Sequence, residues 1–237
     1  MENIGFWIGG KHAVISASNN QKRKCEKIVL LNADNANNFS NKKKIEIKDK
    51  KFFNKIFLNK NINHQGFAAF IYPLEDISVN EFLKETYNQK INLLIIDDIQ
   101  DDRNIGSIIR TSVAFGIAAI IINKREFRSK SPEMYKAASG GMEYINILQV
   151  SNLNNAIELL KKNKIWIYAL DSESQNNIYE EDFDNRSAFV LGSEGKGIKN
   201  LIKQNCDKIL KIPISSKIKS LNVSNATSAL LSILRSK

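Results

Sequence analysis

The stretch DDRNIGSIIRTSVAFGI, residues 101–117, surrounds one arginine with small side chains. At helical spacing its isoleucines form an apolar stripe, while Arg110 shares the other face with three small residues, Gly106, Ser107 and Ala114. An arginine that only adds solubility usually stands among other long polar side chains. The open space around this guanidinium therefore favours a site at which a ligand docks.

Two further segments could bind a ligand through their backbone. Gly192-Ser-Glu-Gly-Lys-Gly197 places three glycines around one acid, and residues 215–234 enter a helix through Ser220, Leu221 and Asn222. Glycine lets a ligand approach the backbone, and the start of a helix has unpaired N–H groups. The glycine loop matches neither the G-x-x-x-x-G-K-[ST] motif nor a first-turn G-x-G-x-x-G motif. Two interpretations stay open, a nucleotide-like ligand and a plain tight turn.

From residue 92 onward the chain carries near-continuous apolar runs separated by helical or loop segments. The runs are NLLIID, IAAIIIN, KIWIYALD, SAFVLG and KILKIPI. Strands buried on both faces have this pattern, so we predict a parallel sheet covered by helices. In open sheets of this type ligands bind beyond the carboxyl ends of the strands. The loops that could hold a ligand therefore follow Asp97, Asp171, Leu191 and Ile212.

Residues 6–72 have a mixed pattern, with a helix predicted from His12, strands predicted at KIVLLN and GFAAFIY, and a lysine run at residues 42–51. Pro73 and the polar stretch after it mark a boundary. We therefore predict an α/β protein with three parts: a small α/β domain at residues 1–75, a linker at residues 76–90 and a parallel-sheet domain at residues 91–237.

The charge of the chain favours a polyanionic partner. The formal net charge is +10, and residues 1–75 hold 13 Lys and Arg against 6 Asp and Glu. Basic proteins are attracted to phosphates whatever the base sequence. We therefore expect nucleic acid as the partner, bound mainly by the N-terminal third. The lysine run is a candidate for phosphate contact, and the alternative is a solvated segment.

Cysteine and histidine usage argues against a disulfide framework and against a metal site, because Cys25, Cys206, His12 and His64 are scattered along the chain. His64 could contact RNA, but a lone histidine in a turn is more often structural. The N-terminus has an acid where a signal peptide needs positive charge, and no apolar run approaches the roughly 18 residues of a membrane span. We expect a cytoplasmic protein with no membrane partner.

Three segments together resemble the three motifs of the SpoU group of SPOUT RNA methyltransferases. They are NIGSIIRTSVAFG at residues 104–116, GSEGKGI at residues 192–198 and IPISSKIKSLNVSNAT at residues 212–227. The resemblance also covers KAASGGMEYINI between the first two motifs, GKHAV at residues 10–14 and HQGF at residues 64–67. The chain is most similar to the branch that methylates a guanosine 2′-hydroxyl in large-subunit ribosomal RNA.

The resemblance implies a small RNA-binding domain, of the kind found in certain ribosomal proteins, joined to a SPOUT domain whose C-terminal part forms a trefoil knot. Periodicity could not have indicated a knot. It also implies a homodimer and S-adenosylmethionine as the cofactor. The positions that match the cofactor contacts of the family are Gly192, Ile212 and Leu221.

The reaction implied by the resemblance is an in-line displacement, so the enzyme must align two reactants and stabilise a forming oxyanion. The family motifs point to five catalytic residues: Asn104, Arg110, Glu194, Ser220 and Asn222. Arg110 stays protonated, so it would orient the hydroxyl or a phosphate and stabilise the alkoxide. Asn104 would position the hydroxyl or hold Arg110, Glu194 would brace the guanidinium, and Ser220 with Asn222 would shape the helix entry. The alternative for both asparagines is helix capping, and for Glu194 a solvated loop acid.

The chain departs from the family pattern before the first motif, where Asp101-Asp102 replaces the usual Asp-Pro. With Asp97 and Asp98, four acids then lie near the expected RNA site. They would repel phosphate, unless an acid at the strand end faces the cofactor instead.

The first functional hypothesis is methyl transfer from S-adenosylmethionine to a ribose 2′-hydroxyl of ribosomal RNA, a guanosine in 23S rRNA. Transfer RNA is the alternative acceptor, because the motifs encode the cofactor site and the reaction rather than the acceptor. A third hypothesis, from another class, is an RNA-binding ribosome assembly factor without turnover. The intact Arg110, Glu194 and Asn222 favour an enzyme.

Overall fold

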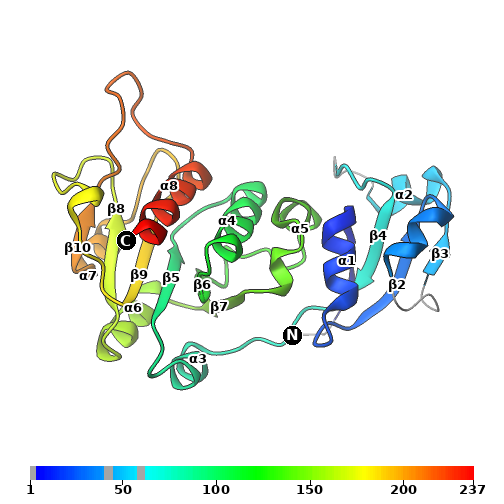
Figure 1. The fold of residues 1–237 in the computed structure, drawn as a ribbon, viewed down its shortest axis with the longest axis horizontal. Helices are drawn as coiled ribbons and strands as arrows, with labels where there is room; N and C mark the ends of the chain where they lie inside the picture. The colour runs from blue at the N-terminus through cyan, green and yellow to red at the C-terminus, as the bar shows by residue number, and fades with distance from the viewer. Residues whose placement is uncertain (1–3, 40–44, 58–61) are drawn as a thin grey trace. The chain divides into compact units, whose positions relative to one another are not determined.

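The computed structural model describes residues 4–39, 45–57 and 62–237, and the chain divides into two compact units (Figure 1). The first unit comprises Met1–Glu75, Asp102–Arg110 and Arg128–Tyr144, and the second comprises Asp76–Asp101, Thr111–Phe127 and Ile145–Lys237. Each unit contains one sheet. The protein is a mixed α/β protein, as the sequence predicts.

The sheet of the first unit has four strands in the order β1-β4-β2-β3. Its strands are β1 (Phe6–Gly9), β2 (Cys25–Leu30), β3 (Ile45–Ile47) and β4 (Phe67–Ile71). Strand β4 pairs antiparallel with β1 and β2, and β3 pairs parallel with β2. The accompanying helices are α1 (Lys11–Asn19), η1 (Ala33–Asn38) and α2 (Lys50–Ile56). Val29, Phe53, Phe57 and Ala68 form a hydrophobic core between α2 and the sheet.

Two segments from further along the chain belong to the same unit. Helix α4 (Asp102–Ala114) contributes residues 102–110, and residues 128–144 form α5 (Pro132–Ala138) and η3 (Gly141–Glu143). The two helices touch at Gly106, where a Cβ atom would lie 2.4 Å from the carbonyl oxygen of Met134. This close approach requires glycine in the first motif segment, independently of any ligand.

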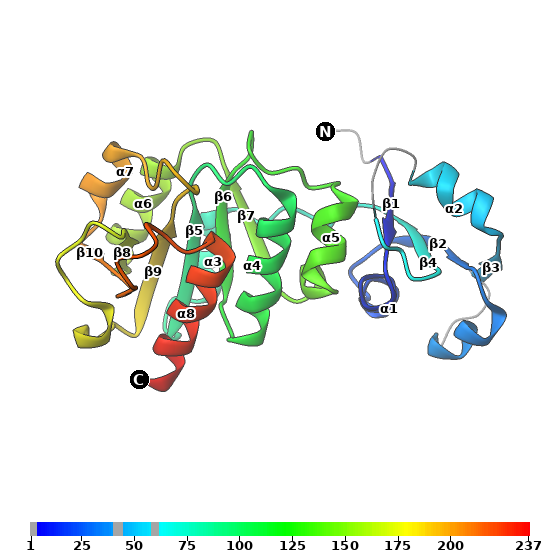
Figure 2. The same ribbon diagram turned by 90° about the horizontal axis from the view of Figure 1, so that it is seen from above.

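The sheet of the second unit has six parallel strands in the order β10-β8-β9-β5-β6-β7. They are β5 (Ile91–Ile96), β6 (Ala119–Asn123), β7 (Asn146–Val150), β8 (Trp166–Leu170), β9 (Arg186–Leu191) and β10 (Lys208–Leu210). The helices are α3 (Val79–Glu85), α6 (Leu153–Lys162), η4 (Ile178–Glu180), α7 (Asn200–Asn205) and α8 (Val223–Ser236). Helices α3, α6 and α7 share one hydrophobic core with the sheet, and α8 lies on the other face (Figure 2).

The parallel sheet confirms the prediction from the apolar runs. The five runs correspond to β5, β6, β8, β9 and β10. Strand β7 escaped prediction because it is an edge strand, in which only Leu148 is fully buried and the pattern is not continuously apolar. Strand β3 was also missed, because it lies within the lysine run, of which residues 42–44 fall outside the described residues. The trefoil knot stays a prediction.

His64 has a structural role in the turn before β4. Its ring stacks on Phe53, with ring centroids 4.5 Å apart, and its Nδ1 accepts a hydrogen bond of 3.0 Å from the backbone N–H of Gly66. Partial burial, and then the charge of Lys136, lower the pKa of His64 below its ordinary value of 6.5. These contacts favour the structural interpretation of His64 over direct RNA contact.

The lowered pKa of His64 predicts a loss of stability in mild acid. As pH falls below 6.5, the unfolded chain takes up the proton before the folded chain does, so the free energy of unfolding decreases down to the folded pKa. We expect the midpoint temperature of thermal unfolding to decrease when the pH is lowered from about 8 to about 5.5. In the His64→Asn variant, whose side chain does not titrate in this range, the decrease should be smaller. An equal fall in both proteins would contradict the prediction.

Candidate active site

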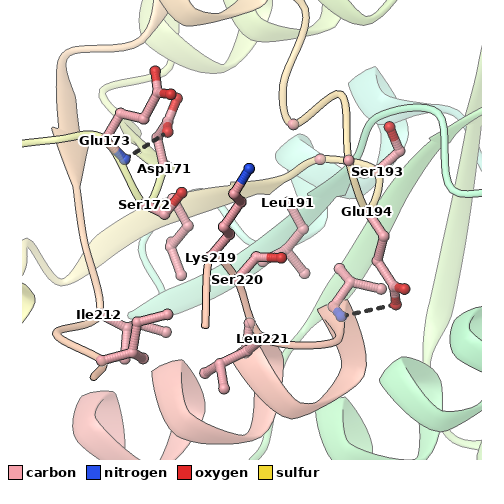
Figure 3. A pocket seen from close by; sticks show the side chains of 17 residues that line it. Asp171, Ser172, Glu173, Leu191, Ser193, Glu194, Ile212, Lys219, Ser220 and Leu221 are labelled. Carbon is pink, nitrogen blue, oxygen red and sulfur yellow. Dashed lines mark hydrogen bonds between the residues drawn. The ribbon is translucent and has the colours of Figure 1, made fainter. Parts of the chain in front are cut away.

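A pocket of about 650 Å³ opens at the carboxyl ends of strands in the second unit (Figure 3). Its walls come from the loops that follow β8, β9 and β10 and from the start of α8. Three of the four loops singled out from the sequence, those after Asp171, Leu191 and Ile212, therefore meet at one pocket. The volume is in the range of small-molecule and cofactor sites.

Five of the eight predicted site residues line this pocket: Gly192, Glu194, Ile212, Ser220 and Leu221. They include all three residues expected to contact the cofactor. Asn222 follows directly and contacts Glu194. Asn104 and Arg110 belong to the first compact unit, whereas the other six predicted site residues belong to the second.

The glycine loop after β9 is a tight turn that also lines the pocket. Ser193 and Gly197 exchange backbone hydrogen bonds of 3.2 and 2.9 Å, and Gly195 and Gly197 have φ of 92° and 66°. A Cβ atom on Gly192 would lie 2.3 Å from the carbonyl carbon of Gly197. The glycines are thus required for closing the loop, and the two interpretations of the sequence are compatible.

Glu194 is fixed by the first residues of α8. One carboxylate oxygen, Oε1, accepts a hydrogen bond of 2.5 Å from Asn222 Nδ2. The same oxygen accepts one of 3.3 Å from the backbone N–H of Val223, drawn as a dashed line in Figure 3. A carboxylate at the start of a helix is also favoured by the helix dipole. Glu194 is therefore more than a solvated loop acid, because its position depends on α8.

Asn222 has the capping role that sequence analysis weighed against a catalytic one. Its Oδ1 accepts hydrogen bonds of 2.9 Å from the backbone N–H of Ser224 and 2.6 Å from the Ser224 hydroxyl. The same side chain donates through Nδ2 to Glu194. One amide thus caps α8 with its oxygen and holds the loop acid with its nitrogen.

Two of the four acids that follow β5, Asp97 and Asp102, form ion pairs with basic side chains. Asp97 is fully buried, its Oδ2 accepts a 2.9 Å hydrogen bond from the backbone N–H of Lys199, and Lys199 Nζ forms an ion pair with its Oδ1 at 3.0 Å. Burial alone would lower the pKa of Lys199, but Asp97 and Glu126 raise it above its ordinary value. Asp102 forms an ion pair with Arg128 at 3.1 Å. Asp97 therefore anchors the residue that follows the glycine loop.

Arg110 and Asn104 lie on α4 in the first unit. The Arg110 side chain is exposed, and its backbone packs on the Gly140-Gly141 turn: a Cβ atom on Gly141 would lie 3.4 Å from Arg110 Cα. Asn104 is half-buried near the start of the helix. The Arg110 side chain is exposed as expected, but its face of the helix is not open throughout, because Gly106 is buried against α5.

Sequence reasoning missed the polar side chains after β8. Asp171, Ser172 and Glu173 line the side of the pocket opposite Glu194 (Figure 3). Partial burial would raise the pKa of Asp171, but the ion pair with Lys203 and the Glu173 N–H lower it below its ordinary value. The available signal was their place after a strand of the parallel sheet, which indicated the loop but not its individual residues.

No helix in the part of the chain that the structure describes is long and apolar enough to cross a membrane. Within the same residues, no group of three or more His, Cys, Asp and Glu side chains is arranged to hold a metal ion.

Comparison with known proteins establishes the family of the chain. Residues 92–232 match the SpoU rRNA Methylase family, and residues 7–77 match the RNA 2′-O ribose methyltransferase substrate binding domain. An uncharacterized tRNA/rRNA methyltransferase of Borreliella burgdorferi is 37% identical over 180 residues, which is 73% of this chain and 79% of that protein. A Staphylococcus saprophyticus protein assigned to the TrmH family of tRNA/rRNA methyltransferases is 36% identical over 71% of this chain and 68% of that protein.

The fold has close relatives among solved structures. The SpoU methyltransferase AviRb from Streptomyces viridochromogenes, crystallised in complex with AdoMet, superimposes with a TM-score of 0.83. The superposition covers 98% of this chain and 89% of that chain, at 16% sequence identity. The protein thus has the fold of the SPOUT methyltransferases. The chain belongs to the SpoU family of RNA methyltransferases, as the three motifs indicate.

The double role of Asn222 predicts that its two functions can be separated by mutation. Asn222→Asp keeps an acceptor for capping α8 but replaces the donor to Glu194 by a second negative charge. We expect nearly normal thermal stability and roughly a tenfold or larger loss of methyl transfer, because the loop acid is displaced. Asn222→Ala should lose the activity and in addition about 1 kcal/mol of stability. Normal activity of the Asp variant would mean that the Glu194 contact is dispensable.

Proposed function

We propose that the protein transfers a methyl group from S-adenosylmethionine to a ribose 2′-hydroxyl of ribosomal RNA, a guanosine of 23S rRNA. The observation that carries the proposal is the pocket at the carboxyl ends of the parallel strands, which gathers Gly192, Ile212 and Leu221 beside the fixed Glu194. Membership of the SpoU family supports the reaction, and AdoMet in the AviRb structure supports the cofactor.

The residues of the pocket fit S-adenosylmethionine. Ile212, Leu221 and Val223 offer apolar contacts for an adenine ring, and Gly192 lets the glycine loop close beside them. The carboxylates of Asp171 and Glu173 suit the hydroxyl or ammonium groups of such a ligand. When bound, the cofactor supplies an electrophilic methyl group.

The chain's own residues would then align and polarise the acceptor. Arg110 cannot act as a base because it remains protonated, so it orients the 2′-hydroxyl or a neighbouring phosphate and stabilises the oxyanion. Asn104 positions the hydroxyl. Glu194 lies at the start of α8, where Asn222 and Val223 donate to it, and Ser220 shapes the entry to this helix.

The choice of ribosomal RNA rests on the N-terminal part of the chain. Residues 7–77 match a substrate-binding domain, and residues 1–75 carry an excess of seven positive charges, 13 minus 6. We propose that residues 1–75 bind the RNA, residues 76–90 link, and residues 91–237 act as the methyltransferase domain. The protein would act in the cytoplasm as a homodimer. Transfer RNA is the second candidate, because the names of both relatives include tRNA and rRNA.

Labelled methyl transfer tests the proposal directly. Unmodified large-subunit ribosomal RNA and transfer RNA are incubated in parallel with the protein and labelled S-adenosylmethionine, and the labelled nucleoside is identified after nuclease digestion. We expect label in 2′-O-methylguanosine from ribosomal RNA. Label in transfer RNA alone would move the function to the second candidate. If neither RNA is labelled, ribosomal particles are tested in the same way, and absence of label there too, with cofactor binding intact, would favour the assembly factor.

Substitution of Arg110 tests the catalytic assignment. Arg110→Ala should lower kcat by about 10²- to 10³-fold with little change in cofactor binding, because the developing oxyanion loses its donor. Arg110→Lys keeps the charge but not the planar fork of donors, so an intermediate rate is expected. If cells carrying the Ala variant grow normally while RNA binding is retained, turnover is not the main role of the protein.

A further inference from the structure

Lys136 on α5 carries a half-buried charge without a carboxylate partner. Its Nζ donates a hydrogen bond of 2.5 Å to Gln65 Oε1, and within the residues that the structure describes it forms no ion pair. Burial lowers its pKa. The half-buried Lys203, by contrast, forms an ion pair with Asp171. A half-buried ammonium held only by a neutral amide is the arrangement expected where an external anion completes the site.

Gln65 is held in an unusual backbone conformation next to this charge. Its φ is 55°, in the left-handed region that disfavours residues other than glycine. The Oε1 atom also accepts a 3.3 Å hydrogen bond from the backbone N–H of Lys11. The residue before Gln65, His64, is held in place by stacking on Phe53. Such backbone strain persists where the surroundings dictate it, and it is concentrated at binding sites.

The side chain of Lys136 lies over a glycine at the start of α1. A Cβ atom on Gly10 would lie 2.6 Å from Lys136 Cδ and 2.9 Å from its Nζ, so any side chain there would displace the ammonium. The GKHAV and HQGF segments, both part of the family resemblance, thus converge on one lysine.

The same unit carries Arg110 close to α1. A Cβ atom on Gly140 would lie 2.3 Å from Ser16 Oγ and 3.2 Å from the carbonyl oxygen of His12. On the next residue, Gly141, a Cβ atom would lie 3.4 Å from Arg110 Cα. One glycine turn therefore separates α1 from the helix that carries Arg110. Arg110 and the start of α1 are therefore near enough for one bound RNA strand to contact both.

We propose that Lys136 and Gln65 together bind a backbone phosphate of the RNA substrate. The ammonium supplies the charge, and Gln65 Nε2, which makes no hydrogen bond to the described residues, donates to a phosphate oxygen or to the ribose. The inference rests on the proposed function, because it takes RNA as the ligand. It gives Lys136, which lies between the first and second family motifs, the role of positioning the RNA.

A separate contact already holds α5 and η3 to the N-terminal sheet. Arg23 and Glu143 form an ion pair of 2.8 Å in which each side chain is 1% exposed, and Arg23 also donates to the carbonyl oxygen of Tyr72. The Lys136–Gln65 contact is therefore not needed to keep the segments together. Variants at these two positions should fold normally.

The experiment measures RNA binding to the full-length protein as a function of salt, with cofactor binding and thermal unfolding as parallel readouts. Lys136→Met should weaken binding about three- to tenfold and reduce the slope of log K against log salt by about 0.7 to 0.9, the loss of one phosphate contact. Lys136→Arg should keep the slope. Lys84→Met removes the same charge from the exposed face of α3 and should change little.

Gln65→Glu distinguishes phosphate binding from a structural role. A carboxylate at this position would neutralise Lys136, so we expect unchanged or higher thermal stability together with weaker RNA binding and a smaller salt slope. A Lys136→Met or Gln65→Glu protein with the slope of the unmodified chain would overturn the proposal. RNA binding is measured without turnover, so it can be interpreted even if the methyl-transfer assay gives no product. Conversely, an unchanged salt slope in these variants would overturn the phosphate contact and leave the proposed reaction intact.

Discussion

The hydrogen bonds between Glu194 and the start of α8 join the loop after β9 to the segment after β10, and the candidate pocket depends on this connection. Parallel strands bring their following loops to one edge of the sheet, but they do not fix how those loops fold. The glycine turn closes one loop on itself, and Asp97 anchors its far end through Lys199. The pocket wall is thus fixed at both ends of the glycine loop.

In the first unit a buried ion pair between Arg23 and Glu143 joins segments that are distant in sequence. Breaking a buried pair by removing one partner costs about 3 to 5 kcal/mol, because the remaining charge is left without compensation. Arg23 and Glu143 therefore commit residues 128–144 to the N-terminal sheet. Asn20 and Arg23 both donate to the same carboxylate, so each of its oxygens has a partner. Because both oxygens of the buried Glu143 carboxylate accept hydrogen bonds, the contact fixes one geometry as well as adding stability.

Much of the second unit could be predicted from sequence because strands buried on both faces leave a continuous apolar run, as in Leu93–Ile96. Edge strand β7 leaves no such run, and α5 and α7, of seven and six residues, are too short for a clear helical period. In the site, glycine spacing and family motifs identified Gly192 and Glu194. Pairings between distant residues, such as Asp97 with Lys199 or Gln65 with Lys136, leave no periodic signal, because they are set by the tertiary fold.

Several residues have a structural role and a place in the candidate site at the same time. Asn222 caps a helix and holds Glu194, and Gly192 closes a turn while lining the pocket. A functional and a structural interpretation of one residue therefore do not compete when the site is made of element ends, where caps and turns occur in any case. Lys136 differs from these residues. Its charge lacks the acidic partner that the half-buried Lys203 has, and stability alone would favour a carboxylate at Gln65. Binding of RNA phosphate accounts for the amide that is present instead.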